Sequence, residues 1–117
     1  MLKEVFMKLL IIGSRTITDF DLTNHIPEGT DLIISGGAKG VDTVAERYAD
    51  EHSIEKLIIK PQYEKYGRAA PLKRNEEMVD KADVVLAIWD GKSKGTDYTL
   101  KYAQKKSKRI IQITITG

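Results

Sequence analysis

The chain has 117 residues, which is the size of one ordinary domain and leaves no room for a separate substrate domain. Its 19 Lys and Arg nearly balance its 17 Asp and Glu, so the formal charge of +2 demands neither a nucleic-acid nor a membrane partner. The absence of cysteine excludes disulfides and thiolate chemistry, and two histidines leave little material for a metal site. We therefore expect no bound metal. No early apolar run is long enough for a membrane span, and none carries a signal-peptide cleavage pattern, so we expect a cytoplasmic protein.

Five short apolar runs, rich in Ile, Val and Leu, recur along the sequence. The apolar residues within most runs are continuous rather than alternating, which is typical of parallel strands that are covered on both faces. Several runs end at residues that favour a turn, such as Gly13 after the first run and Asp90-Gly91 after the fourth. The expected strands are residues 8–12, 31–34, 56–59, 83–89 and 109–115.

The segments between these runs carry helical periodicity. Apolar residues recur at helical spacing over 41–49 and 72–82, and a weaker stripe runs through 96–106. The pattern Thr18-x-x-Asp21 predicts a short first helix that Pro27 stops. This order predicts an α/β domain with a doubly wound, mostly parallel five-stranded sheet and helices on both faces. Ligands of such folds bind outside the carboxyl ends of the strands, so the loops that follow the strands form the candidate site.

Three of these loops are rich in glycine, at 13–15, 35–42 and 90–96. Glycine lets backbone N–H groups approach an anion closely, and the second and third loops run directly into expected helix N-termini, which favour phosphate. We therefore expect a phosphate-bearing ligand, although neither the Walker A pattern nor the G-x-G-x-x-G pattern is present. The loop residues predicted to bind it are Gly13, Ser14, Arg15, Ser35, Gly36, Gly37, Lys39, Gly40, Ser93, Gly95 and Thr96.

Side chains on the expected helices could complete this site. Asp42 either complements the helix dipole or binds a hydroxyl such as that of a ribose, and we expect Glu46 to pair with a cation. Asn75 lies in an apolar stripe, where an amide needs a hydrogen bond, so it either positions a ligand-contacting Arg74 or ties down a neighbouring loop. Segment 62–70 has no clear periodicity and forms either a lid over the site or an irregular loop.

Taken together, these motifs resemble a known superfamily. The matching stretches are G-S-R at 13–15, I-S-G-G-A-K-G-V-D-x-x-A-E at 34–46, K-R-N-x-x-M-V-x-x-A-D at 73–83 and W-D-G-x-S-x-G-T at 89–96. They are similar to the YspA/YpsA-related branch of the SLOG superfamily, which groups Rossmann-like domains related to DprA and to the LOG phosphoribohydrolases. The resemblance implies a single Rossmann-like SLOG-type domain over residues 1–117 and a nucleotide-derived ligand, and it makes a homodimer plausible.

The chain departs from the LOG pattern at the catalytic glutamate. LOG enzymes carry Pro-Gly-Gly-x-Gly-Thr-x-x-Glu in the second of their glycine-rich loops, whereas Thr99 occupies the last of these positions here. The resemblance implies that Arg74 lies near the bond that LOG enzymes cleave, but a threonine cannot supply the carboxylate. We therefore expect a nucleotide-binding sensor or carrier, with no cofactor beyond its nucleotide-like phosphate ligand.

Two alternatives stay open. The first is an enzyme that cleaves N-glycosidic bonds, a phosphoribohydrolase or nucleosidase, for which the catalytic candidates are Arg74, Asp90 and Glu46, with Asp42 as a further carboxylate. The second is binding of single-stranded DNA through the basic cluster at 101–109. The near-neutral charge of the whole chain argues against this second alternative.

Overall fold

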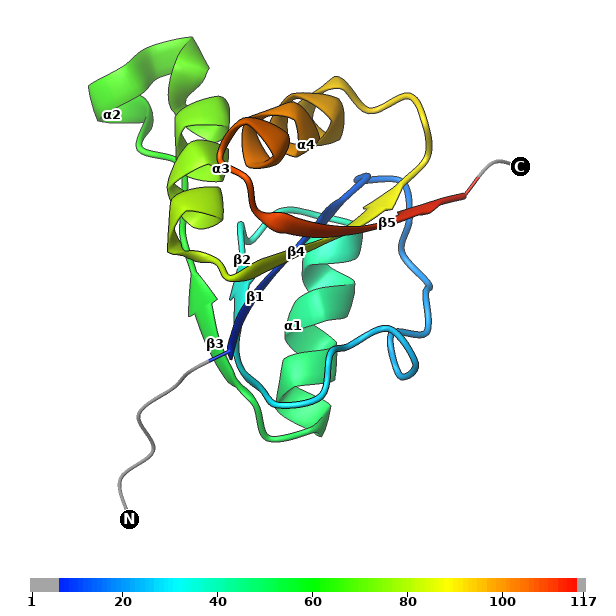
Figure 1. Cartoon of the computed structure of the whole chain (residues 1–117). Coiled ribbons are helices and arrows are strands. Elements are labelled where there is room, and N and C mark those ends of the chain that lie inside the picture. The colour runs from blue at the N-terminus through cyan, green and yellow to red at the C-terminus, as the bar shows by residue number, and fades with distance from the viewer. Residues whose placement is uncertain (1–6, 116–117) are drawn as a thin grey trace.

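A five-stranded parallel sheet forms the centre of the protein, with helices on both of its faces (Figure 1). The computed structural model describes residues 7–115. The strand order is β3-β2-β1-β4-β5, and every neighbouring pair is parallel. This arrangement confirms the predicted doubly wound, Rossmann-like α/β fold. In chain order the elements are β1 (Met7–Gly13), β2 (Thr30–Ser35), α1 (Val41–Glu51), β3 (Glu55–Ile58), α2 (Tyr63–Tyr66), the 3-10 turn η1 (Gly67–Ala69), α3 (Ala70–Lys81), β4 (Val84–Trp89), α4 (Lys94–Lys105) and β5 (Arg109–Thr114).

The continuous apolar runs are explained by cover on both sides of the sheet. Along β1, Leu9 and Ile11 point to the core beneath α1, while Leu10 and Ile12 point to the core beneath α3 and α4. Alternate residues of a strand face opposite sides, so only a strand buried on both faces needs an unbroken apolar run. Central β4 repeats this pattern, and all of its residues except Trp89 are buried.

The predicted first helix, from Thr18 to Pro27, is wrong. Residues 14–29 form a connection of turns between β1 and β2. Asp21 uses its carboxylate to accept a hydrogen bond from the Thr23 backbone N–H at 3.0 Å, a local side-chain bond that competes with helix formation. Leu22, only 2% exposed, then anchors the connection in the core beside α1.

Segment 62–70 and the starts of helices α3 and α4 also differ from the expectations. The segment 62–70, expected to be a lid or an irregular loop, contains α2 and η1, and most of its side chains are exposed. Helix α3 begins at Ala70 with Pro71 in its first turn, where the missing N–H of proline costs no hydrogen bond. Helix α4 begins at Lys94, two residues before the expected start.

The strand order fixes where the loops meet. The chain leaves β1 toward β2 on one side and leaves β4 toward β5 on the other, so the carboxyl ends of β1 and β4 form the switch point of the sheet. Ser14 joins the loops there: its N–H donates to Ile88 O, and its own carbonyl accepts from Val41 N. Across residues 7–115, no helix has the length and apolar character needed to cross a membrane.

Candidate functional site

A cleft of about 270 Å³ opens at the switch point. Its walls come from the end of β1, the start of α1, the first turns of α3 and the first turns of α4. The cleft combines apolar side chains with backbone, hydroxyl, amide and charged groups, a mixture suited to a small organic ligand. We call it the inner cleft; it is lined by Ile12, Gly13, Arg15, Ala38, Asp42, Pro71, Leu72, Arg74, Asn75, Met78, Ser93, Gly95, Thr96 and Thr99.

The glycine-rich loop at 35–40, the second of the three along the chain, is closed by side chains of residues 35–42. Asp42 Oδ2 accepts a hydrogen bond from Ala38 N at 3.0 Å, and Ser35 Oγ accepts one from Gly37 N at 3.3 Å. Burial raises the pKa of Asp42, although the Ala38 N–H and the charge of Arg74 oppose the rise. Two N–H groups that the sequence offered to a phosphate are therefore already hydrogen-bonded within the loop.

Glu46 supports this loop from α1. Its Oε2 accepts a hydrogen bond from Ser35 Oγ at 2.9 Å. Within residues 7–115 the partner of Glu46 is thus a hydroxyl rather than the cation that we expected. Neither Ser35 nor Glu46 lines the inner cleft.

Gly36 is required by the close approach of two charged side chains. A Cβ on Gly36 would lie 2.7 Å from Arg74 Nη1 and 3.0 Å from Asp42 Oδ2. The Gly36 carbonyl accepts a hydrogen bond from Arg74 Nη1 at 2.5 Å. The opposite charges of Asp42 and Arg74 therefore flank the glycine.

Arg74 and Asp42 are the two buried charged residues of the site, and each is 8% exposed. Its Nε donates to Asn75 Oδ1 at 2.7 Å, and its Nη1 donates to Gly36 O and, at 3.4 Å, to Ile59 O. Burial lowers the pKa of Arg74 while the charge of Asp42 raises it, and a guanidinium stays protonated in proteins. In the described part of the chain, the Nη2 atom of Arg74 makes no hydrogen bond, so its two N–H groups are free for a ligand.

Asn75 links this arginine to α4. Its Nδ2 donates to Thr99 Oγ1 at 2.9 Å, and the Thr99 hydroxyl donates to Gly95 O at 2.8 Å. Asn75 thus holds Arg74 and contacts helix α4 rather than a loop, while the contact of Arg74 with a ligand stays a prediction. Thr99 is 1% exposed and fully engaged in this network.

The loop 90–93 is folded around Asp90. Asp90 Oδ1 accepts hydrogen bonds from Lys92 N and Ser93 N, both at 2.8 Å, and these N–H groups lower the pKa of Asp90. The Asp90 N–H in turn donates to Ser14 Oγ at 2.9 Å. Asp90 and Ser14 therefore build the loop, and neither lines the inner cleft.

The start of α4 carries free donors. No hydrogen bond within residues 7–115 engages the backbone N–H of Gly95 or Thr96, and Ser93 provides no side-chain cap to the helix. The hydroxyls of Ser93 and Thr96 lie 3.3 Å apart beside these groups. Free N–H groups and the positive end of the helix dipole favour an anion at this point.

A second cleft, of about 480 Å³, adjoins the first through shared residues Arg15, Ala38 and Arg74. Lys60 lies against Gly37, where a Cβ would be 3.3 Å from Lys60 Nζ. We call this the cationic cleft; it is lined by Arg15, Gly36, Gly37, Ala38, Lys39, Thr43, Lys60, Pro61, Tyr63 and Arg74.

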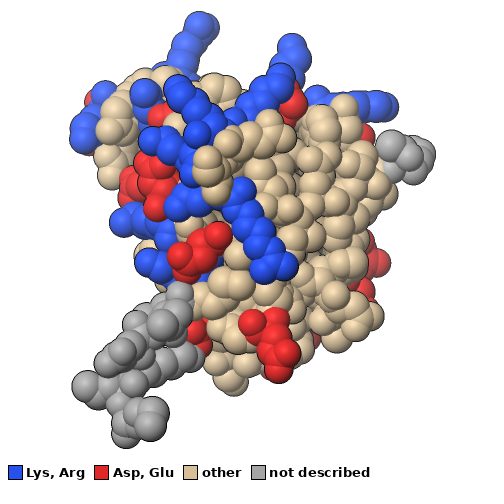
Figure 2. Space-filling view, viewed as in Figure 1, with Lys and Arg blue, Asp and Glu red and all other residues tan. Residues whose placement is uncertain are grey.

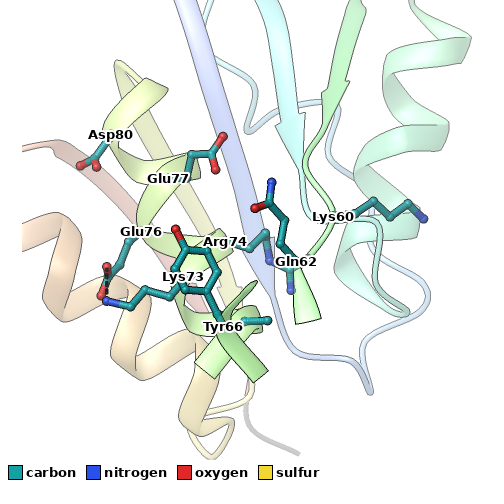
Figure 3. A pocket seen from close by; sticks show the side chains of 9 residues that line it. Lys60, Gln62, Tyr66, Lys73, Arg74, Glu76, Glu77 and Asp80 are labelled. Carbon is teal, nitrogen blue, oxygen red and sulfur yellow. Dashed lines mark ion pairs between the residues drawn. The ribbon is translucent and has the colours of Figure 1, made fainter. Parts of the chain in front are cut away.

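A third cleft lies on the other side of Arg74, between α3 and the segment that follows β3 (Figure 3). In the figure, the ring of Tyr66 is drawn in front of α3 near Lys73, while Lys60 extends away from this helix. Three cations and three carboxylates line it, and Lys73 pairs with Glu76 at 3.9 Å. Tyr98 and Tyr102 of α4 donate hydrogen bonds to Glu76 and Asp80. The third cleft thus has as many carboxylates as cations, and two of these cations, Lys60 and Arg74, also line the cationic cleft.

The structure brings most of the predicted site residues together. Eleven of them line one or both of the first two clefts, whereas Ser14, Ser35 and Gly40 support the loops from behind. Sequence analysis missed Lys60 because it follows β3, whose end carries no glycine signal. It also missed Ala38, Pro71, Leu72 and Met78, which line the inner cleft through their apolar surface. Among residues 7–115, no three His, Asp or Glu side chains are grouped so as to hold a metal ion.

The fold is a Rossmann-like α/β domain, and it is similar to part of a solved structure of DNA processing protein A. The X-ray structure of DNA processing protein A (DprA) from Streptococcus pneumoniae matches with a TM-score of 0.71 at 16% sequence identity, covering 95% of this chain and 51% of that chain. This likeness shows the fold, and the chain spans about half the length of that protein. It confirms the DprA-related fold that the motifs implied, while the finer YspA/YpsA branch stays a prediction.

A sequence relative places the chain in a family. It is 34% identical over 118 residues to Gene 61 protein of Mycobacterium phage D29, and the match covers 89% of this chain and 94% of the relative. The chain therefore belongs to the same family as this phage protein. No protein-family model matches the chain.

Proposed function

We propose that the domain binds a nucleotide or nucleotide-derived ligand in the inner cleft. The observation that carries the proposal is the convergence of two sets of unused donors on one cleft: the N–H groups of Gly95 and Thr96, and the Nη2 of Arg74. Unsatisfied donors beside a helix N-terminus favour a phosphate, and a desolvated guanidinium favours a second oxygen-rich group.

Gly95 supports a ligand role for this loop. A Cβ on Gly95 would meet no heavy atom within 4 Å, and Gly95 lies in the first turn of α4 without a positive φ. The fold alone thus gives no reason for glycine here, in contrast to Gly36. A ligand that approaches the backbone closely would supply one.

The rest of the inner cleft suits the body of a nucleotide. Ile12, Leu72 and Met78 offer apolar contact to a base or sugar. Asp42 has a carboxylate that burial makes easier to protonate, and it lines the same cleft, where it could hydrogen-bond a hydroxyl. We propose a sensor or carrier role because the domain would bind this nucleotide, while the position of the LOG catalytic glutamate holds Thr99.

Isothermal titration with a panel of nucleoside 5′-monophosphates tests the proposal. We expect at least one to bind, and Gly95→Val to weaken its binding at least about tenfold, because the added side chain fills the space against the free N–H groups. Gln104→Val, an exposed change on the same helix, is the control and should leave Kd unchanged. The absence of binding across mono- and diphosphates, with the protein folded, would refute the proposal.

The geometry favours binding over cleavage of an N-glycosidic bond. Thr99 is buried and hydrogen-bonded at the position of the LOG glutamate, and Asp90 is engaged by the N–H groups of its own loop. Of the candidate carboxylates, Asp42 alone lines the inner cleft. We therefore expect no release of free base from nucleoside 5′-monophosphates, a result that chromatography of the reaction mixture would check.

Nucleic-acid binding is a second candidate, favoured by the distribution of charge. Figure 2 shows Lys and Arg gathered over the part of this face where α2, α3 and α4 lie, with some Asp and Glu among them. The exposed cations of α4 and its end include Lys101, Lys105 and Lys106. Steep loss of affinity for single-stranded DNA with rising salt, and its weakening by a Lys105→Ala/Lys106→Ala variant, would support this function.

A further inference from the structure

Four cations and no carboxylate line the cationic cleft. Arg15, Lys39 and Lys60 are exposed on its rim, and within residues 7–115 none of the three forms an ion pair with a carboxylate. The carboxylate of Asp42 lies against Gly36 and accepts the Ala38 N–H, and Asp42 does not line the cationic cleft. The third cleft shares Lys60 and Arg74 with the cationic cleft, and its three carboxylates, Glu76, Glu77 and Asp80, line the third cleft but not the cationic cleft.

Arg74 connects the cationic cleft to the inner cleft. It lines both, it is 8% exposed, and its Nη2 has no hydrogen-bond partner in the part of the chain that the structure describes. Among residues 7–115 no buried side-chain nitrogen or oxygen lacks a hydrogen-bond partner, so Nη2 of Arg74 is accessible to solvent. A ligand oxygen can therefore reach this donor, and Arg74 borders both clefts.

The two clefts offer different kinds of donor. The inner cleft presents the backbone N–H groups at the start of α4, whereas the cationic cleft presents side-chain charges over Gly36 and Gly37. The N–H groups of Gly37 and Ala38 are already hydrogen-bonded, so charge rather than backbone amides attracts an anion there. A phosphate on the N-terminus of α4 would use the backbone donors of the inner cleft, and the side-chain charges of Lys39 and Lys60, which line only the cationic cleft of the two, would be left for another anionic group.

We propose that the ligand carries a second anionic group, and that this group lies in the cationic cleft among Arg15, Lys39, Lys60 and the Nη2 of Arg74. The ligand class is then a nucleotide with at least two phosphates, either a diphosphate or a bisphosphate, rather than a monophosphate. This inference rests on the proposed function, because it assumes that the first phosphate and the nucleoside occupy the inner cleft.

Titration of the whole chain with AMP, ADP and adenosine 3′,5′-bisphosphate, and with the guanosine equivalents, tests the inference. We expect at least one doubly phosphorylated compound to bind about tenfold or more tightly than its monophosphate, the usual gain from one charge-assisted hydrogen bond. A Lys39→Ala/Lys60→Ala variant should remove this difference while leaving the affinity for the monophosphate within about twofold. Lys81→Ala/Lys105→Ala removes the same charge from exposed positions elsewhere and should keep the difference.

The outcomes separate the two proposals. Equal affinity for mono- and doubly phosphorylated compounds would overturn the inference and leave the proposed function standing, whereas no binding of any of them would overturn both. An equal loss in the two double variants would also overturn the inference, because it would reflect net charge alone. A single-stranded oligonucleotide without terminal phosphate that displaces ADP and binds more tightly would overturn the assignment to a free nucleotide.

Discussion

Asn75 fixes the guanidinium of the residue that precedes it, since Asn75 Oδ1 accepts a hydrogen bond from Arg74 Nε at 2.7 Å. Consecutive residues on a helix do not normally face each other, so this contact requires both side chains to turn toward the same cleft. Asn75 also donates to Thr99, whose hydroxyl donates to Gly95 O. The network ties the arginine of α3 to the free N–H groups of α4, and the two donor sets of the inner cleft keep a fixed separation.

Replacement of Asn75 by alanine should therefore affect both stability and binding. The loss of two partly buried hydrogen bonds should lower the free energy of unfolding by about 1–3 kcal/mol, as measured by urea denaturation. The unfixed arginine should raise the Kd for the nucleotide by about tenfold. Asn24→Ala, at an exposed position outside the site, is the control. An effect of Asn75→Ala on Kd no larger than that of the control would contradict the positioning role.

The sequence predicted the sheet because its signal is redundant. Each strand is marked by an apolar run, the helices α1, α3 and α4 are marked by their spacing, and a strand buried on both faces leaves few other arrangements. The prediction of a helix between the first two strands failed because it depended on a single capping pattern. Asp21 uses its carboxylate for a turn at Thr23, and Leu22 is buried by an extended connection rather than by a helix.

The sequence predicted which loops line the crevice, but it did not predict which N–H groups in these loops are free. Glycine content identified the loops of β2 and β4 correctly as the edge of the crevice. It could not show that Asp42 folds back on Ala38, which leaves the α4 loop rather than the 35–40 loop with free N–H groups. Glycine content also could not predict that Lys60 lies against Gly37, because that contact depends on how β3 pairs with β2.

Two glycines of the site should respond differently to alanine. Gly40 has a φ of 77°, and a Cβ there would lie 2.4 Å from Ser14 O, so Gly40→Ala should destabilise the fold by about 2 kcal/mol or more. Gly95→Ala meets no atom within 4 Å and replaces a helical glycine, so the free energy of unfolding should stay constant or rise by up to about 1 kcal/mol. Urea denaturation of both variants checks this contrast. A marked loss of stability in Gly95→Ala would show that the fold itself needs this glycine.

Asp42 should give the fold a measurable pH dependence. Burial raises its pKa above 3.8, with Glu46 adding to the rise and Arg74 opposing it, so the folded state holds the proton more tightly than the unfolded state. Its contribution to stability is therefore greatest below pH 3.8 and is lost as the pH rises through the raised pKa. In Asp42→Asn this loss disappears, so the free energy of unfolding of the variant minus that of the parent should increase with pH across this window. A difference that stays constant from pH 3.5 to 7 would contradict the shifted pKa of Asp42.

Asp90 should control the loop that leads into α4, and Trp89 can report on it. Asp90 Oδ1 accepts the N–H groups of Lys92 and Ser93, and the Ser93 carbonyl accepts the indole N–H of Trp89 at 3.0 Å. Asp90→Ala removes the acceptor for both N–H groups, so the loop should shift, the hydrogen bond of the indole should weaken and the melting temperature should fall. Asp90→Asn keeps an oxygen acceptor and should change both properties less.

Fluorescence measures this directly, because Trp89 is the single tryptophan of the chain. We expect a shifted emission maximum in Asp90→Ala, and no shift in Asp97→Ala, a change in the first turn of α4 that removes the same charge but only an ion pair with Lys101. Asp90→Ala should also bind the nucleotide more weakly, since Ser93 and Gly95 move with the loop. If the emission of Asp90→Ala matched that of the parent while its melting temperature fell, Asp90 would stabilise the chain without positioning this loop.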